Sequence, residues 1–169
     1  EREKKGGQAF YSCLEYNSEI YFGSDNGRVW CYQKENGQFQ LQNLPASSRI
    51  VSINSVEGNE LIFTTAKDGF FSYQPKTKAI EHFPASRFPN ASIHSVYVDK
   101  ASEVWFEQHI PGTVVHFNPR TRILKQEKVP VEPTSTDRSR PAFHIHEDIN
   151  GVLWLHPYRS EERRVVKEC

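Results

Sequence analysis

The stretch EIYFGSDNGRVWCY (residues 19–32) decides the fold class, because the chain returns to the same plan further on. The plan is an apolar run, a turn that contains glycine, and a second apolar run that ends in an aromatic residue. It returns in ELIFTTAKDGFFSY (60–73), in EVWFEQHIPGTVVHF (103–117) and, in shortened form, in GVLWLHPY (151–158). Self-similarity at a fixed spacing is typical of proteins built from repeated structural units.

Two landmarks give the period of the repeat. The starts of the central apolar runs are 41, 43 and 49 residues apart, and the glycines that follow them are 42 and 43 residues apart. The starts are Ile20, Leu61, Val104 and Leu153, and the glycines are Gly27, Gly69 and Gly112. A period near 43 residues matches the length of one β-propeller blade.

Each unit has the pattern of four short strands. The alternating segments RIVSINSV (49–56), SIHSVYVD (92–99) and AFHIHED (142–148) precede the central runs, and a turn with a further short apolar segment follows the closing aromatic residue. Alternation with a period of two residues indicates half-buried strands. Four short strands joined by tight turns predict a blade, and its aromatic residues are expected to pack between neighbouring blades.

Two turns carry dipeptides that favour a hairpin. Asn26-Gly27 and Asp68-Gly69 are typical of two-residue turns, in which both central positions favour a positive φ. We therefore expect a hairpin between the second and third strands of the first two units.

The sequence thus predicts an all-β fold of β-propeller blades, each a four-stranded antiparallel sheet, with about three and a half blades in a partial propeller. Closed rings need roughly 4–8 blades, so we expect an arc of a larger ring. The expected boundaries are 10–158 for the partial propeller, with repeats at 10–48, 49–90, 91–141 and 142–168, a charged N-terminal tail at 1–9 and a divergent C-terminal end at 159–169. Blade faces and edges that lack a neighbour predict either self-association or low stability of the isolated chain.

Composition excludes several classes of protein. The formal net charge is +0, which does not favour a nucleic-acid surface, and no apolar run approaches the ~20 residues of a membrane-spanning helix. Methionine is absent even at position 1, so we expect an excised or processed piece of a longer protein. The cysteines Cys13, Cys31 and Cys169 have no metal-like spacing. Cys13 and Cys31 are expected to pack as small hydrophobic residues, and a disulfide remains open.

Three segments carry a resemblance to a known family. IYFGSDNGRVWCY (20–32), SVYVDKASEVWF (95–106) and HIHEDINGVLWL (144–155) resemble the two-component regulator propeller repeat. The positions that match its aspartates, tryptophans and glycines are Asp99, Asp148, Trp105, Trp154, Gly151, Gly27, Gly69 and Gly112. The sequence departs from that repeat at Glu107-Gln108 and from 159 onward.

The resemblance implies a function. In that family, propellers form the periplasmic sensor region of hybrid histidine kinases, which are anchored in the inner membrane and typically respond to oligosaccharides. We therefore expect a non-catalytic, periplasmic sensor fragment without cofactor or membrane contact of its own, whose partner is an oligosaccharide ligand. Two alternatives remain: a propeller enzyme, such as a metal-dependent lyase or hydrolase, and a scaffold that binds another protein.

Candidate site residues follow from the repeat. Asp99 and Asp148 precede tight turns, where a carboxylate accepts backbone N–H groups, and the tryptophans are expected to serve blade packing. Long connections on a rigid scaffold often carry binding function. The hypothesis is a ligand site on the end of the ring built by inter-blade connections such as 84–91 and 129–141, and its candidate residues are Arg49, Asn90, Arg138 and Arg140.

One further cluster has the chemistry of a metal site. His144, His146 and Asp148 share one face of a strand, and two imidazoles with a carboxylate can bind a transition metal. The aligned positions of the preceding unit are Ser95, Tyr97 and Asp99, which favours ordinary strand polarity and no metal.

Overall fold

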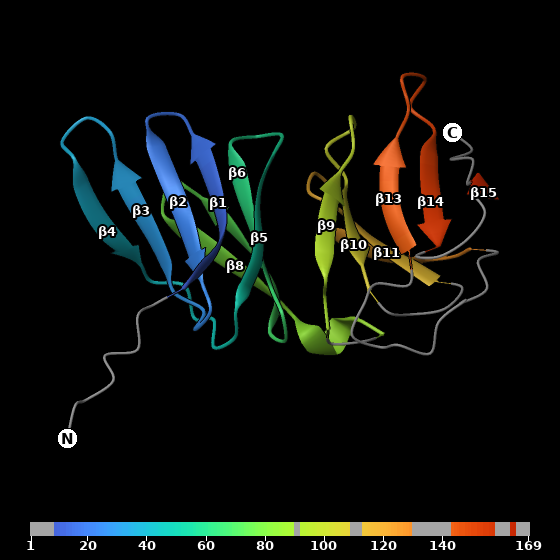
Figure 1. Cartoon of the computed structure of the whole chain (residues 1–169), viewed down its shortest axis with the longest axis horizontal. Helices are drawn as coiled ribbons and strands as arrows, with labels where there is room; N and C mark the ends of the chain where they lie inside the picture. Colours follow the sequence, from blue (N-terminus) through green and yellow to red (C-terminus); the bar gives the residue numbers. More distant parts are fainter. Residues whose placement is uncertain (1–8, 90–91, 109–112, 130–142, 158–162, 165–169) are drawn as a thin grey trace.

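The computed structural model describes residues 9–89, 92–108, 113–129, 143–157 and 163–164 (Figure 1). Within these residues the elements are strands, apart from the short 3-10 helix η1 (Ala85–Arg87). Among them there is no helix with the length and apolar character that crossing a bilayer demands.

The strands form four separate antiparallel sheets, which we call blades 1 to 4. Blade 1 contains β1 (Phe10–Tyr16), β2 (Glu19–Ser24), β3 (Val29–Gln33) and β4 (Gln38–Gln42). Blade 2 contains β5 (Ile50–Val56), β6 (Glu60–Thr65), β7 (Gly69–Gln74) and β8 (Ala79–Pro84). Blade 3 contains β9 (Ser95–Val98), β10 (Val104–Glu107), β11 (Thr113–Asn118) and β12 (Ile123–Lys128). Blade 4 contains, among the described residues, β13 (Phe143–Glu147), β14 (Leu153–Pro157) and β15 (Arg163–Arg164).

Each blade is a meander, because its strands pair in the order in which they follow one another in the sequence. The blades stand side by side in an arc, with blade 1 and blade 4 at opposite ends of the molecule (Figure 1). The first strands of blades 1, 2 and 3 contact one another along this arc. The prediction of an all-β partial propeller built from four-stranded blades is confirmed.

The hairpins between second and third strands are present, but their turns differ from the prediction. β2 ends at Ser24 and β3 begins at Val29, so the turn contains four residues instead of two. Gly27 and Gly69 have φ of +81° and +90°, whereas no positive φ occurs at the asparagine or aspartate before them. The longer turn lets the glycine alone take the left-handed conformation.

The core lies between the blades. We call the interface between two neighbouring blades a seam and number the seams along the chain. At the first seam, Tyr21 of blade 1 packs against Phe63 and Tyr73 of blade 2, with ring centroids 6.0 and 6.2 Å apart. At the third seam, Trp105 of blade 3 shares a buried cluster with Ile145 of blade 4. The aromatic residues of the central strands therefore join neighbouring blades, and each buried ring removes a large apolar area from water.

The middle seam contains the densest aromatic cluster. The ring of Phe70 in blade 2 lies 4.5 Å from that of Phe83, 5.0 Å from that of Phe106 and 4.9 Å from that of Phe117, and the last two belong to blade 3. These side chains are almost fully buried. Blades 2 and 3 are thus held by direct contacts between phenyl rings.

An arginine completes the middle seam. The Arg122 side chain of blade 3 donates hydrogen bonds from Nη1 to Glu60 Oε1 (2.7 Å) and from Nε to Glu81 Oε2 (3.0 Å), both in blade 2. Its guanidinium lies 5.2 Å from the ring centroids of Phe83 and Phe117. Burial alone would lower the pKa of Arg122, but the two carboxylates outweigh it and raise that pKa.

Substituting Gly69 tests how tightly the second hairpin packs. A Cβ at Gly69 would lie 2.1 Å from the Phe83 carbonyl oxygen, at a φ of +90°. At Gly58 φ is +86°, but a Cβ would meet nothing within 4 Å. Gly58→Ala is therefore expected to lower the free energy of unfolding by about 1–2 kcal/mol. Gly69→Ala is expected to lower it by about 1–3 kcal/mol more, because backbone must move. Urea unfolding measures both, and equal losses would contradict the packing described.

Candidate functional site

The two ends of the blades carry different loops and turns. The connection end carries the links between blades and the turns between second and third strands, such as 43–49 and 25–28. The opposite end carries the remaining turns of each blade, such as 17–18 and 75–78. In Figure 1 the connection end is the lower edge of the arc.

At the connection end, Arg49 lies beside an aromatic ring. Its guanidinium carbon is 5.1 Å from the ring centroid of Tyr11 at the start of β1, and both residues are exposed. The pair offers a cation and a phenol ring to solvent near the first strands of two blades. Of the predicted ligand residues, Arg49 is the one that the structure places; Asn90, Arg138 and Arg140 lie outside the described residues, as does Gly112.

Asp68 fixes the connection that leads to Arg49. Its carboxylate accepts hydrogen bonds from the backbone N–H groups of Ser47 (2.9 Å) and Ser48 (2.8 Å) and from both hydroxyls. Burial by itself would raise the pKa of Asp68, but these hydrogen bonds outweigh it and hold that pKa below its ordinary value. The link between blades 1 and 2 is thereby tied to the β6–β7 turn.

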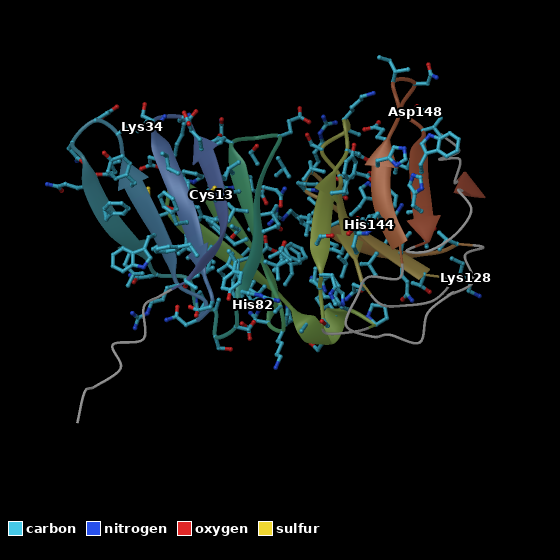
Figure 2. All side chains as sticks on the ribbon, viewed as in Figure 1. Cys13, Lys34, His82, Lys128, His144 and Asp148 are labelled. Carbon is cyan, nitrogen blue, oxygen red and sulfur yellow. The ribbon has the colours of Figure 1, made fainter. Side chains whose placement is uncertain are left out.

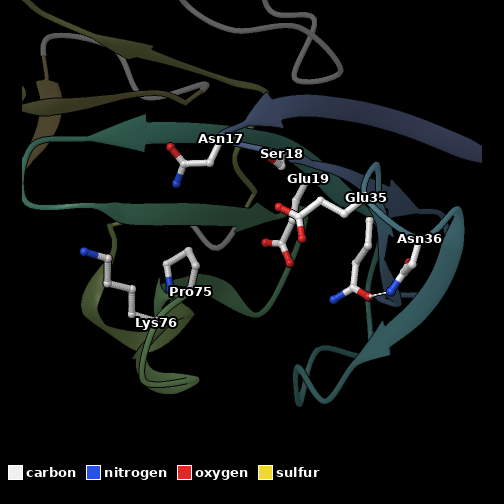
Figure 3. A pocket seen from close by; sticks show the side chains of 8 residues that line it. Asn17, Ser18, Glu19, Glu35, Asn36, Pro75 and Lys76 are labelled. Carbon is white, nitrogen blue, oxygen red and sulfur yellow. Dashed lines mark hydrogen bonds between the residues drawn. The ribbon is translucent and has the colours of Figure 1, made fainter.

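At the opposite end, a polar groove runs between blades 1 and 2 (Figure 3). Its volume is about 400 Å³. Turns of both blades line it, and the lining residues are Asn17, Ser18, Glu19, Gln33, Glu35, Asn36, Pro75 and Lys76. Amides, a hydroxyl, two carboxylates and an ammonium group suit a ligand that is itself rich in hydrogen-bonding groups.

A buried polar cluster adjoins the groove at Glu19. The hydroxyl of Tyr21 donates a hydrogen bond to Glu19 Oε2 at 2.5 Å. Burial, together with the neighbouring carboxylate, raises the pKa of Tyr21 far above its ordinary value. Burial and the charge of Glu19 also raise the pKa of the Cys31 thiol to about 11. Tyr21 and Cys31 therefore stay protonated at neutral pH, and the cluster positions Glu19.

The histidine-rich strand does not form the metal site that its sequence allows. His144 Nδ1 lies 3.3 Å from Glu107 Oε2, whereas His146 Nδ1 lies 3.0 Å from Nε2 of His156 on the next strand. Asp148 is engaged elsewhere, in its own turn. Among the described residues, no group of three or more His, Cys, Asp and Glu side chains could hold a metal ion.

Asp99 and Asp148 organise the turns that follow them. Asp99 Oδ1 accepts the backbone N–H groups of Ala101 and Glu103, both at 2.9 Å, and its Oδ2 accepts the indole N–H of Trp105 at 2.9 Å. The backbone contacts have the form that the sequence predicts, whereas the indole contact was not anticipated.

Blade 4 repeats the arrangement residue for residue. Asp148 Oδ1 accepts the backbone N–H groups of Asn150 (2.8 Å) and Val152 (3.0 Å), and Oδ2 accepts the Trp154 indole at 3.0 Å. Gly151 takes a φ of +82° inside this turn. The equal six-residue spacing from aspartate to tryptophan in both blades is the sequence signal that could have revealed the indole bond.

Glu107 is a second residue whose role the sequence did not reveal. It is buried between blades 3 and 4, where its Oε1 accepts the backbone N–H of Ile145 at 2.8 Å and its Oε2 contacts Ser95 and His144. Burial raises the pKa of Glu107, although Ile145 and His144 act in the opposite direction. The residue appeared only as a departure from the repeat, yet it joins the last two blades.

Comparisons with known proteins found similar chains among solved structures. No protein-family model and no curated protein sequence matches the chain. The extracellular domain of a putative hybrid two-component system from B. thetaiotaomicron is similar in structure, with a TM-score of 0.66 at 18% identity over 99% of this chain and 23% of that chain. A second such domain from B. thetaiotaomicron has a TM-score of 0.63 at 15% identity, covering 92% of this chain and 22% of that one.

An enzyme has the same fold. Catalytically inactive virginiamycin B lyase from Staphylococcus aureus, with Quinupristin, has a TM-score of 0.72 at 10% identity, over 97% of this chain and 54% of that chain. The chain thus spans less than a quarter of the two extracellular domains and about half of the lyase. The expected likeness to the extracellular propellers of hybrid two-component systems is confirmed in the fold.

Glu107 and Asp68 are expected to make the free energy of unfolding depend on pH in opposite directions. The raised pKa of Glu107 favours the folded state below the ordinary carboxyl value of 4.5, and this contribution is lost as pH rises toward the raised pKa. The lowered pKa of Asp68 contributes above its ordinary value of 3.8 and is lost as pH falls below it.

The measurement is urea unfolding of the wild type and two variants between pH 3 and 7.5. The stability of the wild type relative to Glu107→Gln should fall as pH rises above about 4.5, because glutamine stays neutral. Relative to Asp68→Asn, it should fall as pH drops below about 4. Parallel curves for either variant would refute the corresponding assignment.

Proposed function

We propose that the chain is part of the extracytoplasmic sensor region of a hybrid two-component histidine kinase, and that it binds an oligosaccharide without catalysing a reaction. The observation that carries the proposal is the shared blade architecture with two extracellular domains of such systems. An auxiliary nutrient binding protein from Bacteroides ovatus, with a TM-score of 0.60 at 11% identity, adds a binding protein to the same fold. On this proposal the domain lies in the periplasm and the parent protein in the inner membrane.

The groove between blades 1 and 2 supplies chemistry for such a ligand. Sugar hydroxyls both donate and accept hydrogen bonds, and Asn17, Asn36 and Gln33 offer amides that do the same. Glu35 and Lys76 are exposed on turns of the two blades that line the groove, so a ligand that reaches both would bridge the first seam. Bridging two blades is a way to convert binding into a change in their relative position.

A binding role also agrees with how the candidate catalytic groups are used. The His146 and His156 rings contact each other, and the Asp148 carboxylate accepts three hydrogen bonds, from two backbone N–H groups of its own turn and from the indole of Trp154. The lyase that shares this fold makes a propeller enzyme the second candidate. Turnover of a ligand during the binding measurements would favour that candidate.

A panel of soluble oligosaccharides, neutral and acidic, tests the proposal by isothermal titration calorimetry on the whole chain. We expect one class to bind, and Lys76→Ala and Glu35→Ala to weaken it roughly tenfold each, because hydrogen bonds to charged groups contribute about 1.5–3 kcal/mol. Lys67→Ala is the matched control, since Lys67 is also exposed but lies on a turn at the connection end.

Arg49→Ala separates the two ends of the blades. If binding weakens in Arg49→Ala and not in Lys76→Ala, the ligand binds at the connection end, as the sequence predicts. Absence of binding across the panel, or hydrolysis or elimination products in the calorimeter cell, would overturn the proposal of a non-catalytic oligosaccharide sensor.

A further inference from the structure

A second polar groove lies between blades 2 and 3, and we call it the second groove. Its volume is about 280 Å³, and the residues that line it include Glu60, Gln74, Ala79, Glu81, Pro119 and Arg122. It lies at the same end of the blades as the groove between blades 1 and 2, opposite the connection end. Figure 2 shows this end at the upper edge of the arc, where Lys34 of the β3–β4 turn lies, with His82 of β8 nearer the lower edge.

The two grooves are built from equivalent positions of successive repeats. Each is lined by the first residue of a second strand, by the last residue of a third strand, and by the proline that directly follows the third strand of the next blade. The equivalent pairs are Glu19 with Glu60, Gln33 with Gln74, and Pro75 with Pro119. The repeat therefore places a carboxylate and an amide at corresponding points of the first two seams.

A cation from the next blade also lies at both seams. Lys78 and Arg122 have the same place in their turns, immediately before the fourth strand, with φ of 60° and 61°. Arg122 Nη1 donates a hydrogen bond to Glu60 of the preceding blade at 2.7 Å. Partial burial by itself would lower the pKa of Lys78, but Tyr73 and the charge of Glu19 outweigh that effect and raise the pKa. The glutamate of each groove is thus matched by one cation of the following blade.

The charges of the two linings are the same, with two carboxylates and one cation in each. They are Glu19, Glu35 and Lys76 between blades 1 and 2, and Glu60, Glu81 and Arg122 in the second groove. Even with Lys78 counted, neither groove has more cations than carboxylates. An acidic group on a ligand would therefore gain no net attraction, whereas carboxylates and amides accept hydrogen bonds from the hydroxyls of a neutral sugar.

The size and spacing of the grooves suit successive parts of one extended ligand. Their volumes of about 400 and 280 Å³ lie near the lower end of the range of about 300–1,000 Å³ that ligand pockets occupy, so neither suits a long ligand alone. Sheets that pack face to face lie about 10 Å apart. Equivalent points of successive seams are then separated by about the length of two linked sugar rings.

We propose that the groove between blades 1 and 2 and the second groove are subsites of one binding path, which takes a linear, neutral oligosaccharide that crosses the end of blade 2. The inference rests on the proposed function, because it assigns the charge and the minimum extent of the oligosaccharide that the sensor binds. On this path Gln33 and Gln74 contact sugar units about one blade apart, and Lys76 lies on the blade 2 turn between them.

Chain length is the first test. Isothermal titration calorimetry on the whole chain compares linear glucose and mannose oligosaccharides of increasing length, from disaccharide to hexasaccharide, with oligogalacturonides of the same lengths. The favoured neutral hexasaccharide should bind one to one and at least tenfold more tightly than its disaccharide, because it alone occupies both grooves. The oligogalacturonide hexasaccharide should bind at least tenfold more weakly than the neutral one.

A blocking variant tests the second groove directly. Ala79 is exposed at the start of β8 and lines the second groove, so Ala79→Trp should fill part of it while leaving every side chain of the Arg122 ion pairs in place. Ala79→Trp and Lys76→Ala should each weaken hexasaccharide binding by at least tenfold. Ile123→Trp is the matched control, because Ile123 is exposed at the equivalent position of blade 3 and lines neither groove. Circular dichroism checks that all three variants are folded.

Failure of this inference differs from failure of the proposed function. A hexasaccharide that responds to Lys76→Ala but not to Ala79→Trp, or that binds no better than the disaccharide, would confine the ligand to one groove and leave the sensor role standing. Tighter binding of oligogalacturonides would overturn the assignment of a neutral ligand. Absence of binding by every oligosaccharide would refute both proposals.

Discussion

Burial of the sides that neighbouring sheets turn toward each other is the constraint on which the rest of the structure depends. A four-stranded sheet with apolar side chains on its two sides gains stability only when a neighbour covers each side. The chain meets this constraint by placing a ring of one blade among those of the next, as with Tyr21 against Phe63 and Tyr73. Polar contacts are added to these seams and do not replace them.

The three seams share the packing of apolar side chains but differ in their polar contacts. The first seam has the hydrogen bonds from Ser47 and Ser48 to Asp68, the second has Arg122 with two glutamates, and the third has Glu107 on the backbone of blade 4. Their differing partners give each seam its own response to charge and pH. The same fold is therefore repeated with a different set of polar contacts at each of the three seams.

The periodicity of the sequence was sufficient to predict the strands and the blades, because alternation and hairpin glycines are local signals. The turn at Gly27 was predicted as too short, since the Asn-Gly pair reports a preference for a positive φ but not the number of residues around it. The role of Asp148 as a hydrogen-bond acceptor could also be predicted, because it depends on residues of the same turn. The expectation that Cys13 packs as a small hydrophobic residue is wrong, since Cys13 is exposed. The exposure of Cys13 could not be predicted, because it depends on whether a neighbouring blade covers blade 1.

The groove was also beyond the reach of sequence patterns. Its lining comes from turns of two blades, and none of its residues forms a motif. Glu107 was visible only as an irregularity in the repeat, and His156 gained meaning only when β14 placed it beside His146. These features arise from contacts across seams, whereas sequence periodicity reports contacts within one blade.

Arg122 has a mechanical consequence. A partly buried guanidinium held by one buried and one exposed carboxylate adds little net stability, but its two ion pairs fix the position of the Arg122 side chain relative to blade 2. The phenyl rings on either side of it are non-directional by comparison and would permit small rotations. The ion pairs of Arg122 therefore restrict sliding between blades 2 and 3 more than the phenyl rings alone would.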